Sequence, residues 1–130
     1  MSVLALLGLA GVALRAQMLS PSHVDEFAGH PRVVVISDIG NEPDDQMSFV
    51  RLHLYSNELD LEAMIASTST WQKAPAHPET MHALINAYGE VRGNLLKHTA
   101  GWPESAQLDA RVFAGQTGYG MAATGTGKMS

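Results

Sequence analysis

The feature that most constrains the fold is a run of four β-branched residues, Val33 to Ile36, followed at once by a loop rich in turn residues. Such a run is typical of a strand buried on both faces, as in a parallel sheet covered by helices. A helix is expected from about Pro43 to Ser56, because a proline and two aspartates open it. Its apolar positions predict a broad buried face formed by Met47, Phe49, Val50, Leu52 and Leu54.

The rest of the chain continues the alternation of strand and helix. Leu61 to Ala66 is a second candidate strand, with Leu61, Ala63 and Ile65 alternating along it. Strand, helix and strand at this spacing predict a right-handed βαβ unit and therefore an α/β fold. A helix is expected from Pro78 to His98. Glu104 to Ala114 could be a further helix, although the run Arg-Val-Phe-Ala inside it could equally be a strand, since four residues carry too little periodicity to decide.

Length and composition narrow the function classes. The 130 residues suit one small domain, and the net charge of −5 gives no electrostatic footprint for nucleic acid. The absence of cysteine excludes a disulfide framework, a zinc ribbon and a thiol nucleophile. Residues 1–16 are expected to be a secretory signal peptide, because the apolar run from Val3 to Leu14 has that length and is too short for a stable membrane span. Residues 17–31 read as a polar connector.

The stretch that carries chemistry runs from Asp38 to Asp45. It holds four carboxylates and one amide within eight residues, directly after the first strand. Ligands of open α/β sheets bind beyond the carboxyl ends of the strands. Clustered carboxylates repel one another unless solvent, a helix N-terminus or a cation offsets their charge, and hard oxygen ligands suit Ca²⁺ or Mg²⁺. The plainer alternative is a solvated acidic turn that opens the helix.

The segment VVVISDIGNEPDDQMSFVRLHLYSNELDLEAMIASTSTW resembles the start of the nucleoside hydrolase fold. It is most similar to the nucleoside hydrolase-like domain of larger secreted proteins often labelled cellulose-binding, whose longer loop follows an Asp-x-Gly-x-x-Pro-Asp-Asp pattern. HPETMHALINAY and GYGMAATGTGK extend the resemblance over residues 32–130. It implies the N-terminal part of a parallel, Rossmann-like open sheet flanked by helices, truncated before the second half of the site.

The resemblance implies roles for matching positions. Asp38 matches a Ca²⁺ ligand that also acts as the general base toward a metal-bound water, and Asp45 matches the second carboxylate on Ca²⁺. Asp44 matches the residue that binds the sugar hydroxyls. Asn41, the amide of the loop, is a candidate substrate-binding residue without a counterpart in the nucleoside hydrolases.

Two classes of function follow from this reading. The first is part of a calcium-dependent hydrolase of N-glycosidic or related glycosidic bonds, acting on a small nucleoside or carbohydrate. The second is a carbohydrate-binding domain without catalysis, or an inactive truncated product, on the same fold. Trp71 and Trp102 could stack on a sugar ring, but a tryptophan in a loop more often packs against the core, and that is the expectation for both.

Overall fold

The computed structural model describes residues 29–118 and 120–125, so the expected signal peptide and most of the connector lie outside the described residues. Three parallel strands form one sheet in the order β1-β2-β3, which confirms the α/β fold. The strands are β1 (Arg32–Ser37), β2 (Asp60–Ala66) and β3 (Val112–Ala114). The helices are α1 (Pro43–His53), α2 (Pro78–Leu95) and α3 (Ser105–Asp109), with short 3₁₀ turns at Ser56–Glu58 (η2) and Gly120–Ala123 (η3).

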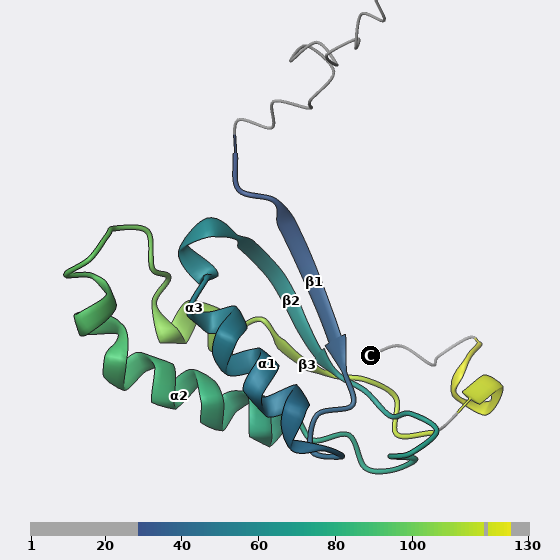
Figure 1. Cartoon of the computed structure of the whole chain (residues 1–130). Helices are drawn as coiled ribbons and strands as arrows, with labels where there is room; N and C mark the ends of the chain where they lie inside the picture. Colours follow the sequence, from purple (N-terminus) through teal and green to yellow (C-terminus); the bar gives the residue numbers. More distant parts are fainter. Residues whose placement is uncertain (1–28, 119, 126–130) are drawn as a thin grey trace, which may run out of the picture.

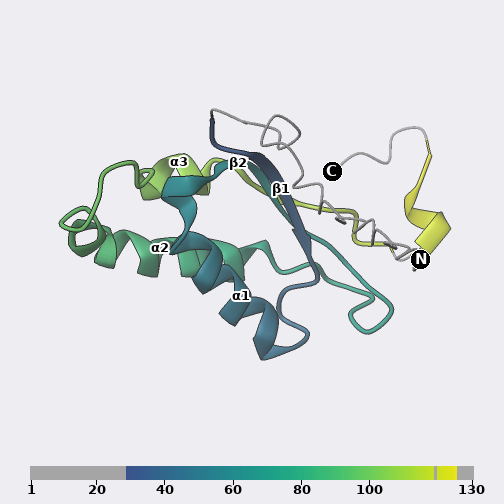
Figure 2. The same cartoon turned by 45° about the horizontal axis from the view of Figure 1, so that its top comes forward.

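The core lies between the sheet and its helices. Both views place α1 and α2 on the same face of the sheet (Figures 1 and 2). Aliphatic, methionine and aromatic side chains from every layer meet there, and the core consists of Ile39, Phe49, Leu61, Met64, Ala66, Met81, Ile85, Tyr88, Trp102 and Leu108. This single apolar cluster holds β1, β2 and the helices in fixed positions, and so it positions the loops that leave the strands.

The opposite face of the sheet is exposed among the described residues. Val34 is 56% exposed, Ile36 66% and Phe113 45%. The expectation that β1 is buried on both faces is therefore wrong for this part of the chain. Burial alternates along the strand instead, with Val33 and Val35 packed against the core. A β-branched run reports strand propensity, but it cannot report whether a second layer is present.

A bulge sets which residues of β2 face the helices. The register passes from Val33 opposite Leu61 to Val34 opposite Ala63, so one step on β1 matches two on β2. The alternation of Leu61, Ala63 and Ile65 therefore fails after Leu61, and the buried residues are Leu61, Met64 and Ala66. Sequence periodicity could not show this, because the bulge is a property of the strand pair.

The helices are shorter than their patterns predicted. Helix α1 ends at His53, and its buried residues are Phe49 and His53, whereas Met47, Val50 and Leu54 are exposed. Helix α2 ends at Leu95. The segment expected to be either helix or strand contains both, α3 and then β3. No helix within the described residues is long and apolar enough to cross a bilayer.

The exposed sheet face predicts self-association. We expect the chain to form oligomers at micromolar concentrations, because Val34 and Ile36 lie on β1, whose outer edge pairs with no other strand within residues 29–118 and 120–125. The double variant Val34→Thr/Ile36→Thr keeps β-branched side chains and should sediment as a monomer with little change in Tm. Val33→Thr is the matched control, because Val33 packs against the core; it should lower Tm and leave the oligomers in place. Equal sedimentation of the double variant and the unmodified chain would contradict this.

Candidate functional site

The carboxyl ends of the three strands meet at one edge of the sheet, from which their loops extend together (Figure 1). Backbone hydrogen bonds continue beyond the strands: Ser67 N–H donates to the Ser37 carbonyl at 2.8 Å, and Gly115 N–H donates to the Ala66 carbonyl at 2.7 Å. The three loops are thus joined where they begin. This is the edge at which open α/β sheets bind their ligands.

The acidic loop turns sharply at Gly40. Its φ of +103° lies in a region that residues with a side chain rarely adopt, and a Cβ there would lie 3.0 Å from the ring of His77. The Asn41 N–H donates to the Asp38 carbonyl at 3.2 Å and closes the turn. The glycine therefore lets the loop pass close to the start of α2.

Asp38 and Asp45 lie at this edge, and both are half-buried. Asp38 follows the last residue of β1, while Asp45 is in the first turn of α1. The Ser37 hydroxyl donates a 2.7 Å hydrogen bond to Oδ1 of Asp45, which ties the start of α1 to the end of β1. The serine was not a predicted site residue. Its role arises from the contact between β1 and α1. A serine at the end of a strand does not by itself indicate such a contact in the sequence.

The other predicted residues of the loop are more open. Asp44 and Asn41 are exposed, as is Glu42, which precedes α1 and makes no side-chain hydrogen bond that caps the helix. The structure thus fixes Asp45 next to β1 and leaves Asp44 and Asn41 accessible to solvent. The exposure of these side chains also agrees with the alternative interpretation, a solvated acidic turn that opens the helix.

Gln72 joins the acidic loop to the loop after β2. Its Nε2 donates to the carbonyls of Asp38 and Ile39 at 3.0 and 3.2 Å. The side chain is buried, and its two hydrogen bonds join the two loops in one arrangement. Sequence reasoning missed Gln72, because its partners lie 33 and 34 residues away and a glutamine in a polar loop carries no distinctive pattern.

The carboxylates of this loop fit a hard cation in donor chemistry, because Asp38 and Asp45 offer oxygen ligands and no sulfur-containing side chain lies in residues 38–45. Within residues 29–118 and 120–125, however, no three His, Asp or Glu side chains gather in a group that could hold a metal ion. Asp38 and Asp45 could supply only part of a ligand set, and further oxygen ligands would have to complete it.

The two tryptophans have different environments. Trp102 is 8% exposed and packs in the core, as expected. Trp71 is 81% exposed, so the expectation that it also packs against the core is wrong. Trp71 lies in the loop after β2, between Ser69 and the buried Gln72. The side chain extends from the same edge of the sheet as the acidic loop.

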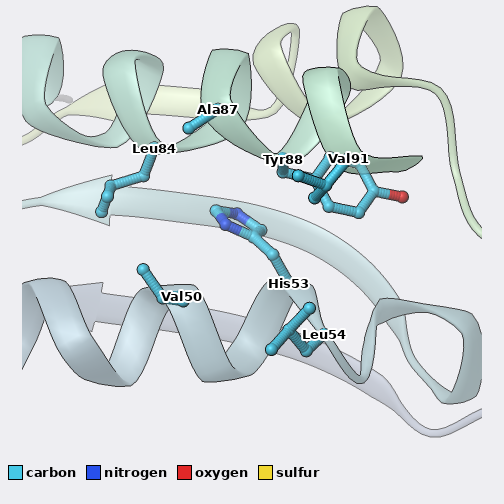
Figure 3. Close-up of a pocket in the computed structure, with 7 residues that line it drawn as sticks. All are labelled: Val50, His53, Leu54, Leu84, Ala87, Tyr88 and Val91. Atoms are coloured by element: carbon cyan, nitrogen blue, oxygen red, sulfur yellow. The ribbon is translucent and has the colours of Figure 1, made fainter. Parts of the chain in front are cut away.

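A separate apolar cavity of about 220 Å³ lies between α1 and α2, away from the acidic loop. Figure 3 shows the imidazole of His53 reaching from α1 toward Leu84 and Tyr88 of α2. The ring is buried, and neither of its nitrogens has a hydrogen-bond partner among the residues that the structure describes. Burial lowers the pKa of His53 to about 4, so the imidazole is neutral at pH 7.

An open parallel sheet with an acidic loop at its carboxyl edge defines an α/β protein whose candidate site lies at the strand ends. The family model described as the nucleoside hydrolase-like domain of cellulose-binding Sde182 matches residues 32–130, and the chain belongs to that family.

A solved structure agrees with this family. A nucleoside hydrolase-related hypothetical protein from Saccharophagus degradans, described as associated with carbohydrate metabolism, superposes with a TM-score of 0.72 at 38% identity. The match covers 78% of this chain and 25% of that one, so the chain spans about a quarter of its solved relative. The comparison with curated proteins found no match.

Proposed function

We propose that the acidic loop contributes the N-terminal half of a hydrolytic site for N-glycosidic or related glycosidic bonds. The observation that carries this proposal is the position of Asp38 and Asp45 at the carboxyl edge, with Asp45 held by the Ser37 hydroxyl at 2.7 Å. A carboxylate that is positioned and half-buried can act on a water molecule without first reorganising. The membership in a nucleoside hydrolase-like family supports the same reaction class.

The proposed roles are those that the resemblance to the nucleoside hydrolases implies for the matching carboxylates. Asp38 would take a proton from a water molecule as the water oxygen bonds to the anomeric carbon. The glycosidic bond breaks as this bond forms, and the leaving group takes the electron pair of the broken bond and a proton from an acid outside the described residues. Asp44 and Asn41 are exposed and would hydrogen-bond to the sugar hydroxyls. Asp38 and Asp45 would hold Ca²⁺, which when bound makes water more acidic.

Calcium binding by the chain tests the metal part of the proposal. Calorimetric titration at pH 7 should give a Kd of about 0.1–1 mM, the range of sites with few protein ligands. Asp38→Asn and Asp45→Asn should each weaken it about tenfold or more. Asp60→Asn is the matched control. It removes the same charge from an exposed residue at the amino end of β2, which is opposite to the edge where the acidic loop lies. Equal affinities in Asp38→Asn and Asp60→Asn would contradict the site.

Catalysis is tested with inosine as the probe, by measuring released base. Asp38→Asn should remove turnover in any form of the protein that shows it, while circular dichroism stays unchanged. Unchanged turnover in this variant would overturn the role of Asp38 as the base.

The second candidate function is carbohydrate binding without catalysis. The lack of a group of three acidic or histidine side chains in the described part of the chain favours it, as does the cellulose-binding description of the family. A binding domain should be retained on insoluble cellulose even in excess chelator. Retention that is lost in chelator, or a complete lack of retention on cellulose, would count against this function. For either function we propose secretion, on the basis of the apolar run from Val3 to Leu14.

A further inference from the structure

We infer that Trp71 is a stacking platform for the ring of a pyranose sugar, at the edge of the site that the acidic loop forms. This inference rests on the carbohydrate class of ligand proposed above and names a residue that would bind it. The first observation is exposure: the indole is 81% exposed, although a tryptophan gains more than almost any residue from burial. An exposed indole offers a flat apolar face that a ligand ring can cover.

The second observation is that the backbone carrying Trp71 is held in place. The Ser69 hydroxyl accepts hydrogen bonds from the N–H groups of Trp71 and Gln72, at 3.1 and 3.0 Å. The Ser69 N–H donates back to the Gln72 carbonyl at 2.7 Å, which closes the turn. An indole on a closed turn loses little backbone freedom when a ligand covers it, and this favours binding.

The third observation is the link to the acidic loop. Gln72 follows Trp71 directly, and its side chain bonds to the carbonyls of Asp38 and Ile39. The loop that carries the indole is therefore joined to the loop that carries the carboxylates by the side chain of Gln72. A sugar has an apolar face of C–H groups and a rim of hydroxyls, so its face suits the indole and its rim suits nearby carboxylates and amides.

The surroundings of Trp71 favour a sugar over a protein partner. The residues before it, Ser67 to Thr70, all carry hydroxyl groups, and Lys73 follows Gln72. Protein interfaces bury an apolar core of many side chains, whereas this loop offers a single aromatic ring among polar groups. One ring with a polar rim is the arrangement expected of a carbohydrate subsite.

The chain contains its own reporters for the test. Trp71 is exposed and Trp102 is buried, so acrylamide should quench the fluorescence of Trp71 first. Titration with cellohexaose should shift the emission to the blue and protect it from acrylamide. Trp102→Phe, which leaves Trp71 as the sole reporter, should keep this response. Trp71→Ala should remove it and weaken binding about tenfold or more in calorimetry, with Trp71→Phe in between.

The outcomes separate this inference from the proposed hydrolysis. In the Asp38→Asn variant, cellohexaose should still protect Trp71 from acrylamide, even if the variant loses calcium binding and turnover. Binding that is equal in Trp71→Ala and the unmodified chain would overturn the platform and leave the hydrolytic proposal standing. Protection of Trp71 that grows with protein concentration and not with cellohexaose would also overturn it, in favour of a contact between copies of the chain.

Discussion

The chain is expected to lose about 3 kcal/mol of stability as the pH falls from 6.5 to 4, because of one buried histidine. Burial lowers the pKa of His53 from 6.5 to about 4 in the folded state. Below pH 6.5 the unfolded chain binds a proton at this residue while the folded chain does not, so unfolding becomes more favourable. Above pH 6.5 the ring is neutral in both states and this contribution stays constant.

The surroundings of His53 offer no compensation for its charge. The ring of Phe49 packs edge-on at a centroid distance of 6.2 Å, and Tyr88 of α2 lies at 5.7 Å. Both ring nitrogens lack a hydrogen-bond partner, so protonation would bury a charge in an apolar setting. The cost is therefore expected to be set by desolvation, which is the cause of the lowered pKa.

His53→Leu isolates this contribution from the carboxylates that also titrate at low pH. Urea unfolding at several pH values should show a flatter stability profile for this variant than for the unmodified chain. The variant should also be at least as stable at pH 7, because it removes two unpaired polar atoms. His98→Leu, at an exposed position, should leave the profile unchanged. A profile that is equally steep in His53→Leu would contradict the prediction.

Gln72→Ala is expected to lower both stability and ligand binding. It removes the hydrogen bonds to the carbonyls of Asp38 and Ile39, which costs about 1–3 kcal/mol, because Ile39 is fully buried. For a domain of this size, each kcal/mol lowers Tm by about 4–8 °C. The brace between the two loops is lost with them, so Ca²⁺ affinity and the protection of Trp71 by cellohexaose should both fall.

Lys73→Ala is the matched control, since it changes an exposed side chain in the same loop. It should leave Tm and Ca²⁺ affinity unchanged. Thermal unfolding followed by circular dichroism measures the first effect, and calorimetry the second. A Gln72→Ala variant that loses stability but keeps both ligand signals would show that the brace supports the fold and not the site.

The elements of this fold could be predicted where one periodic pattern extends over several turns or a whole strand. Helix α2 and strand β1 follow from the spacing of their own apolar residues, and the acidic loop follows from its composition. The exposure of one face of β1 could not be predicted, because it depends on which layers pack against the sheet. Likewise Val50 and Leu54 belong to the apolar pattern of α1 yet remain exposed beside its cavity.

The sequence predicted the acidic residues of the candidate site, and it did not predict the residues that hold its loops in place. Asp38 and Asp45 stand out, because they belong to four carboxylates that fall within eight residues after a predicted strand and repel one another. Ser37 and Gln72 owe their roles to partners in other elements, so no local pattern identifies them. Trp71 is a related case, because whether an aromatic residue in a loop is buried or exposed depends on the course of the chain around it.

The bulge in β2 has a consequence for comparing this domain with its relatives. The bulge adds one residue to β2 between Leu61 and Met64. Only because of this extra residue do Leu61, Met64 and Ala66 all point to the helices. A relative with a regular strand and one residue fewer would present the same inward side chains. An alignment must therefore open a gap next to Glu62. Without that gap it would equate inward residues with outward ones on one side of the bulge, and core substitutions would be mistaken for surface changes.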